Sequence, residues 1–134
     1  MNEPSTIQSM LDAQTIAVVG LSDDPAKPSH YVSAYMQQHG YRILPVNPSL
    51  ATVLGETSYP SLTALCAEQK PDVVDVFRLP RFIPAIVDEM IQLGLKNLWI
   101  QQGIIDHVSA ARAEAAGIHV VMDRCIMVEH RNRR

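Results

Sequence analysis

Residues suited to binding an anion follow the first apolar run of the chain, residues 15–19. Gly20 comes directly after the run, Ser22 lies two positions further on, and Lys27 precedes a predicted helix. A glycine lets a ligand approach the backbone closely, and loop N–H groups with the following helix N-terminus favour an anion. Ser22 supplies a hydroxyl group and Lys27 a positive charge. The loop alone is equally compatible with a turn glycine and solvated side chains.

Two further apolar runs end in residues of the same kind. One ends at Val46 and Asn47, followed by Pro48, and the next ends at Phe77 and Arg78. An arginine beside an aromatic ring suits a phosphate group or a stacked base. The alternatives are a simple turn at the Asn-Pro pair and an arginine paired with a helix carboxylate.

A fourth apolar run, residues 97–101, ends in Gln101 and is followed by Gln102 and Gly103. Two amides and a glycine suit the polar edge of a ligand, although they equally satisfy loop backbone groups. Because the carboxyl ends of parallel strands meet at one edge of a sheet, we expect these positions to share one crevice.

Groups for covalent or metal chemistry are sparse. The five histidines are scattered, and the two cysteines, Cys66 and Cys125, lack metal-ligand spacing. Cys125 follows the last apolar run, where it is either a small buried hydrophobe or a thiol near the ligand with its pKa lowered by Arg124. We therefore predict no catalytic residue, no metal site and no self-contained enzyme activity.

Composition excludes several classes of protein. The chain has 134 residues, which predicts a single domain, with a core over about 10–128 and a polar, basic tail over 129–134. A hydrophobic content of 47% argues against disorder, and a net charge of −3 argues against nucleic-acid binding. No apolar run suggests a membrane span or a secretory signal. Two cysteines without a disulfide framework indicate a cytoplasmic protein. We expect a monomer or a weak homodimer.

Apolar runs alternate with helical patterns along the whole chain. This alternation predicts an α/β Rossmann-like three-layer sandwich with a doubly wound, mainly parallel sheet of five to six strands. The expected strands are 15–19, 41–46, 73–77, 97–101 and 118–122, with a possible short strand at 53–54.

Helix boundaries follow from capping residues and prolines. Ser5 with Gln8, Ser29, Ser61 and Asp106 are the expected caps. Pro84 fits the first turn of another helix. Pro45 weakens the last pairing of the second strand, which is expected to end near this residue.

Binding of NAD or another adenine nucleotide is an alternative that the first loop disfavours. The loop has one glycine rather than the Gly-x-Gly-x-x-Gly fingerprint, and the second strand ends in Asn47 rather than in an acidic residue.

Six segments together resemble the small CoA-binding proteins related to bacterial YccU. They are VVGLSDDPAKPSHYV, GYRILPVNP, LGETSYPSL, VVDVFRLP, LWIQQGI and VVMDRC, spread over roughly residues 10–130. These proteins look like the N-terminal nucleotide domain of the succinyl-CoA synthetase α subunit standing alone.

The resemblance implies that coenzyme A (CoA) lies along the strand ends. It places Gly20, Ser22 and Lys27 at the diphosphate and Val46 and Asn47 at the adenosine. It also places Phe77 and Arg78 on the next wall, with Gln102 and Gly103 beside the pantetheine arm.

One position departs from the family pattern. Ser49 follows the Asn-Pro pair, where relatives often have a basic residue. This puts a 3′-phosphate contact there in doubt, and Arg42, Arg78 or the tail are the substitutes.

The resemblance favours a carrier, sensor or partner subunit for CoA or acyl-CoA. The related ligase needs a phosphorylated histidine domain and an ATP-grasp partner, for which this chain has no room. The alternative in a different class is a thiol redox protein, in which Cys125 and CoA form a mixed disulfide.

Overall fold

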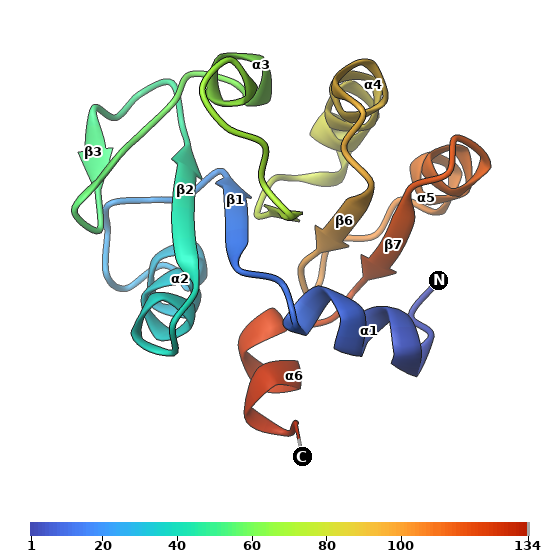
Figure 1. Ribbon diagram of the computed structural model, residues 1–134, viewed down its shortest axis with the longest axis horizontal. Helices are drawn as coiled ribbons and strands as arrows, with labels where there is room; N and C mark the ends of the chain where they lie inside the picture. The colour runs from blue at the N-terminus through green and yellow to red at the C-terminus, as the bar shows by residue number, and fades with distance from the viewer. Residues whose placement is uncertain (134) are drawn as a thin grey trace.

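Five parallel strands form one sheet in the computed structural model, which describes residues 1–133 (Figure 1). The spatial order is β2-β1-β5-β6-β7, so the chain starts near one edge, moves outward and then crosses back to fill the other half. This doubly wound arrangement confirms the predicted fold class. The strands are β1 (Thr15–Val19), β2 (Arg42–Val46), β5 (Val73–Val76), β6 (Asn97–Ile100) and β7 (His119–Met122).

Helices cover both faces of the sheet and produce the three layers (Figure 1). Side chains alternate along each strand, so that Ala17 and Val19 pack on one face while Ile16 and Val18 pack on the other. The first face is covered by α3 (Leu62–Cys66), α4 (Ile83–Leu93) and α5 (His107–Ala115), and the second by α1 (Pro4–Leu11), α2 (Pro28–Gln38) and α6 (Ile126–Arg131).

The pairing of the edge strand β2 ends at Val46, near Pro45 as predicted. Val46 still pairs with Val19, and its carbonyl accepts a hydrogen bond of 3.0 Å from the Gly20 N–H. The Pro45 carbonyl points to the outer edge of the sheet, where it accepts from the Tyr59 N–H at 3.0 Å. The missing N–H of Pro45 therefore also faces outward, which an edge strand tolerates.

Beyond β2, the expected short strand is one half of a hairpin. The strands β3 (Thr52–Val53) and β4 (Glu56–Thr57) pair antiparallel in a separate small sheet. A short 3-10 helix, η1 (Pro80–Phe82), leads into α4 on the other side of the cleft described below.

Two of the expected helix caps are confirmed. Ser61 accepts from the Ala64 N–H at 3.0 Å, and Asp106 accepts from the Ser109 N–H at 3.0 Å. Pro84 also lies in the first turn of α4, as predicted.

The other two expected caps are wrong. The helices α1 and α2 begin at Pro4 and Pro28, with Glu3 and Lys27 as N-caps that make no side-chain capping bond. A proline suits the first helical position because its fixed φ angle is helical and its missing N–H has no partner there. Ser29 is thereby placed inside the first turn of α2, facing the sheet.

A helix occupies the segment where the sequence predicted the start of a polar tail. Ile126, at the start of α6, is fully buried, and His130 Nδ1 lies 2.9 Å from the Tyr35 hydroxyl on α2. Arg133 donates to the Leu11 carbonyl at 3.0 Å and pairs with Asp12. The shortness of this helix, which has six residues, hid its few buried contacts. Arg134, also assigned to the tail, lies outside the described residues.

The buried contact of Ile126 is expected to hold α6 on the sheet. Replacing a buried isoleucine with alanine removes packing and leaves a cavity, so Ile126→Ala should lower the free energy of unfolding by about 2–5 kcal/mol in urea. Val108 is 80% exposed on α5, and Val108→Ala is the control that should stay within about 0.5 kcal/mol of the parent. Equal losses in both variants would show that α6 contributes no packing.

Candidate ligand-binding site

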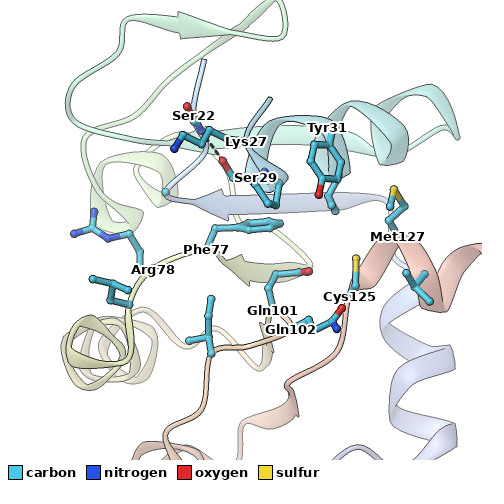
Figure 2. Close-up of a pocket in the computed structure, with 16 residues that line it drawn as sticks. Ser22, Lys27, Ser29, Tyr31, Phe77, Arg78, Gln101, Gln102, Cys125 and Met127 are labelled. Carbon is cyan, nitrogen blue, oxygen red and sulfur yellow. Dashed lines mark hydrogen bonds between the residues drawn. The ribbon is translucent and has the colours of Figure 1, made fainter. Parts of the chain in front are cut away.

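A cleft of about 800 Å³ opens at the carboxyl ends of the strands, between α2 and α6 (Figure 2). Its floor comes from the ends of β5 and β6, one wall from the loop after β1 with the start of α2, and the other wall from the segment around the start of α6. The lining residues are Gly20, Ser22, Lys27, Pro28, Ser29, Tyr31, Val32, Phe77, Arg78, Leu79, Gln101, Gln102, Ile104, Cys125, Met127 and Val128.

Gly20 lies at the exit of β1, where there is no room for a side chain beside the exit of β5. Its φ angle is +88°, and a Cβ atom at this position would lie 2.6 Å from the Phe77 carbonyl oxygen and 2.9 Å from Arg78 Cδ. A side chain is therefore excluded both by the backbone conformation and by the neighbouring strand. This close approach brings the loop of residues 20–27 beside Phe77 and Arg78.

The loop after β1 is held by short-range hydrogen bonds. The Ser22 N–H donates to the Ser29 hydroxyl at 2.9 Å (Figure 2). The Ser22 hydroxyl accepts from the Asp24 N–H at 3.0 Å. Ser29, which the sequence predicted as a cap, instead anchors the loop from within α2. These bonds place Lys27 at the N-terminus of an 11-residue helix, whose dipole favours a negative charge.

Two cations face the cleft without a partner. Within residues 1–133, neither Lys27 nor Arg78 forms an ion pair, which removes the predicted alternative of a carboxylate partner for Arg78. The Arg78 guanidinium instead lies 4.0 Å from the centre of the Phe82 ring. A cation held by an aromatic face keeps its hydrogen-bond donors free for a ligand.

A buried polar pair lies at the floor. Gln101 is 3% exposed and its Nε2 donates to Asp75 Oδ1 at 2.6 Å. Asp75 itself is 2% exposed in the middle of the sheet. Burial raises the pKa of its carboxyl group to about 7, against smaller opposing contributions from the hydrogen bonds of Gln101 and of the Val76 backbone.

The wall at α6 is apolar and contains sulfur atoms. Cys125 and Met127 lie on the opposite side of the cleft from Lys27 and Arg78 (Figure 2). The segment before α6 is fixed by Trp99, whose indole Nε1–H donates to the Arg124 carbonyl at 2.9 Å. The cleft therefore has a cationic end and an apolar end.

Six of the nine predicted site residues line this cleft: Gly20, Ser22, Lys27, Phe77, Arg78 and Gln102. The other three do not. Val46 packs in the core, Asn47 Nδ2 donates to the Leu21 carbonyl at 3.0 Å, and the Gly103 N–H donates to Asp123 Oδ1 at 2.7 Å. Asn47 and Gly103 thus stabilise the two loops that flank the cleft.

The sequence placed Gln101 beside Gln102 at the exit of the fourth run, but the resemblance assigned only Gln102 to the ligand, and most of the apolar lining was missed. The fourth apolar run makes Gln101 the last residue of a strand, whereas β6 ends at Ile100 and leaves Gln101 at the mouth of the sheet. A polar residue closing an apolar run was the available signal. No such signal marked Tyr31, Met127 and Val128. They lie on helices, and the sequence does not specify which side of each helix faces the cleft.

Residues 1–133 contain neither a metal-ligand cluster nor a membrane-spanning helix. No group of three or more potential metal-ligating side chains comes together there. No helix among these residues is long and apolar enough to cross a membrane.

This geometry defines a Rossmann-like α/β protein, with its cleft outside the carboxyl ends of the strands. Residues 14–131 match the CoA-binding domain family, and the chain belongs to that family. The narrower resemblance to YccU stays a prediction.

Comparison with individual proteins agrees with this membership. The uncharacterized protein YneT of Bacillus subtilis (strain 168) is 38% identical over 118 residues, which cover 88% of this chain and 86% of YneT. The structure of cell-free ID.343 from Thermus thermophilus is 38% identical with a TM-score of 0.85, covering 98% of each chain.

A third likeness concerns the fold alone. The dinucleotide-forming acetyl-coenzyme A synthetase 1 of Ca. Korarchaeum cryptofilum is 21% identical, with a TM-score of 0.75 over 87% of this chain. The match covers 28% of the synthetase chain.

The close approach at Gly20 should make that position intolerant of any side chain. Gly20→Ala adds a collision with Phe77 to the cost of a positive φ angle, so we expect a stability loss of at least about 3 kcal/mol. Gly40 has a φ angle of +94°, and a Cβ atom there would have no neighbour within 4 Å, so Gly40→Ala isolates the conformational cost of about 1–2 kcal/mol. Chemical unfolding of both variants measures the difference. Equal losses would mean that the two strand ends are not tightly packed.

Proposed function

We propose that the cleft binds coenzyme A or an acyl-CoA. Membership of the CoA-binding domain family supports this ligand class. The observation that carries the proposal is the placement of two unpaired cations, Lys27 and Arg78, at one end of a cleft that is apolar at the other. CoA has the same division, with phosphate groups at one end and a thiol-bearing arm at the other.

The residues of the cationic end fit a diphosphate. Gly20 exposes backbone, Ser22 keeps a hydroxyl proton free to donate, and Lys27 lies at a helix N-terminus. The Arg78 guanidinium is the second positive charge. Val46 and Asn47 lie beyond the cleft lining, and a role at the adenosine end remains part of the proposal for them.

The residues of the apolar end fit the pantetheine arm. Ile104, Met127 and Val128 supply apolar contacts, while Gln102 offers an amide. Gly103, held by Asp123, shapes the turn that follows. The chain has the cationic and apolar features that the whole ligand needs.

We further propose that the protein presents or senses CoA, as a carrier or partner subunit, and that a second protein performs any chemistry. The fold of this chain corresponds to 28% of the length of the Korarchaeum synthetase, so the same domain architecture occurs within a larger enzyme.

Binding is tested by titration calorimetry of the purified protein with CoA, acetyl-CoA, dephospho-CoA and NAD at fixed salt. We expect CoA to bind and NAD to give no heat. A difference in affinity between CoA and dephospho-CoA would show that the protein contacts the 3′-phosphate. Binding of NAD with CoA silent would replace this proposal by the dinucleotide alternative.

Arg78 is expected to contribute directly to affinity. Removing a charge-assisted hydrogen bond typically costs about 1.5–3 kcal/mol, so Arg78→Ala should weaken CoA binding at least about tenfold. Arg81 lies 4.9 Å from the same Phe82 ring but outside the cleft lining, which makes Arg81→Ala the matched control with unchanged affinity. Equal affinity of both variants would remove Arg78 from the site.

A second function is favoured by the position of Cys125. Its thiol lines the apolar end of the cleft, where the thiol of a bound CoA would lie under the first proposal. In a thiol redox protein, the Cys125 thiolate attacks the disulfide bond of CoA disulfide. A protein–CoA mixed disulfide forms and one CoA leaves as its thiolate, so no further oxidant is needed.

Intact-protein mass spectrometry after incubation with CoA disulfide tests this second function. We expect a CoA adduct that is lost in Cys125→Ser and kept in Cys66→Ser. Cys66 lies on the opposite face of the sheet, and burial raises the pKa of its thiol, which lowers its reactivity. An adduct that persists in Cys125→Ser would exclude the cleft thiol.

A further inference from the structure

The Asp75–Gln101 pair connects the interior of the sheet with the floor of the cleft. Asp75 lies on the central strand β5, between Val18 of β1 and Trp99 of β6 in the register. Its side chain faces the α2 and α6 side, as do Phe77 and Gln101. Gln101 is the member of the pair that lines the cleft.

The chemistry of the pair determines which end of the Gln101 amide faces the ligand. An ionised carboxylate accepts hydrogen bonds but cannot donate them, so only the Gln101 NH₂ group can bond to it. This bond, of 2.6 Å, leaves the Gln101 carbonyl oxygen on the other side. Figure 2 shows that oxygen pointing into the space between Phe77 and Cys125.

We propose that Asp75 is a positioning residue that turns the Gln101 carbonyl oxygen into the cleft, so that the floor selects a ligand carrying an N–H donor at this point. The inference rests on the proposed function. The pantetheine arm of CoA contains two amide N–H groups, which are donors of this kind, and 3′,5′-ADP lacks both of them.

Protonation of Asp75 releases this constraint. A protonated carboxyl group has an O–H donor and an acceptor oxygen, so it can bond to either end of the Gln101 amide, as an asparagine at this position also can. Burial raises the pKa of Asp75 to about 7, so the acceptor is held toward the ligand above this pH and is no longer held there below it. Affinity for a ligand with an N–H donor should therefore fall as the pH drops through 7.

Other titratable groups lie on the elements packed over Asp75. None of them forms a hydrogen bond or an ion pair with Asp75 within residues 1–133. They are Lys27, His30, Tyr31, Tyr35 and His39 around α2, and Arg124, Cys125, Glu129, His130 and Arg131 around α6. Burial lowers the pKa of His130, where α6 meets α2, and the variants below separate its titration from that of Asp75.

The test compares Asp75→Asn with the parent protein by calorimetry between pH 6 and pH 8. The ratio of the two CoA dissociation constants, variant over parent, should rise from near one at pH 6 to about fivefold at pH 8, the effect of one hydrogen bond. Titration of the ligand phosphates and of His130 cancels in this ratio. With 3′,5′-ADP, which lacks the pantetheine arm, the ratio should stay near one.

Two further variants complete the experiment. Gln101→Met removes the acceptor and should weaken CoA binding mainly at pH 8. Asp72 lies just before β5 and accepts from the Gln14 and Thr15 N–H groups at the opposite end of the sheet. Asp72→Asn is therefore the matched control. The ratio of its CoA dissociation constant to that of the parent should not change with pH.

The outcomes separate this inference from the proposed function. A pH-independent ratio for Asp75→Asn, or the same pH dependence with 3′,5′-ADP, overturns the positioning role while CoA binding stands. Absence of binding of both ligands to the parent protein overturns the proposed function and this inference together. Folding should survive the substitution, because a buried group whose pKa is raised destabilises the fold when it is charged.

Discussion

The contact between the Gly20 backbone and the Phe77 carbonyl is the constraint on which the candidate site depends. It lets the exits of β1 and β5 approach closely, so the loop of residues 20–27 lies against Phe77 and Arg78. The bond from the Ser22 N–H to Ser29 then joins that loop to α2. A side chain at residue 20 would push these parts away from each other, and the two cations would no longer face one ligand.

Charge is distributed unevenly around this contact. The protein as a whole carries a net charge of −3, yet the two cations of the cleft have no carboxylate partner within residues 1–133. An aromatic ring holds Arg78 without neutralising it. A local positive end on an acidic molecule favours an anionic ligand of limited size over an extended polyanion, whose outer charges the acidic surface would repel.

Much of the fold was predictable because parallel strands are continuous apolar runs. The runs at residues 15–19 and 73–77 predicted the central strands to within one residue. Helix ends were less predictable, because a serine and a proline compete for the same boundary, and the proline prevailed at Pro28. The helix α6 was missed, since six residues with polar neighbours carry too little periodicity.

The site was predictable where it follows strand ends and unpredictable where it follows helix faces. Gly20 and Arg78 lie in the cleft because topology places every strand exit at one edge. Met127 lies there because α6 packs across α2, and that packing depends on contacts between distant residues. The Asp75–Gln101 bond is equally hard to predict, because Asp75 lies on β5 and Gln101 follows β6, with the helix α4 between them in the chain.

The two walls of the cleft come from opposite halves of the chain. The hydrogen bond between Tyr35 on α2 and His130 on α6 joins residues that are 95 positions apart. A ligand touching both walls therefore acts as a reversible cross-link across a very long loop, and it resists separation of the walls as a covalent staple would. Such a link contributes no stability until both walls have formed. It therefore slows unfolding while leaving the rate of folding almost unchanged.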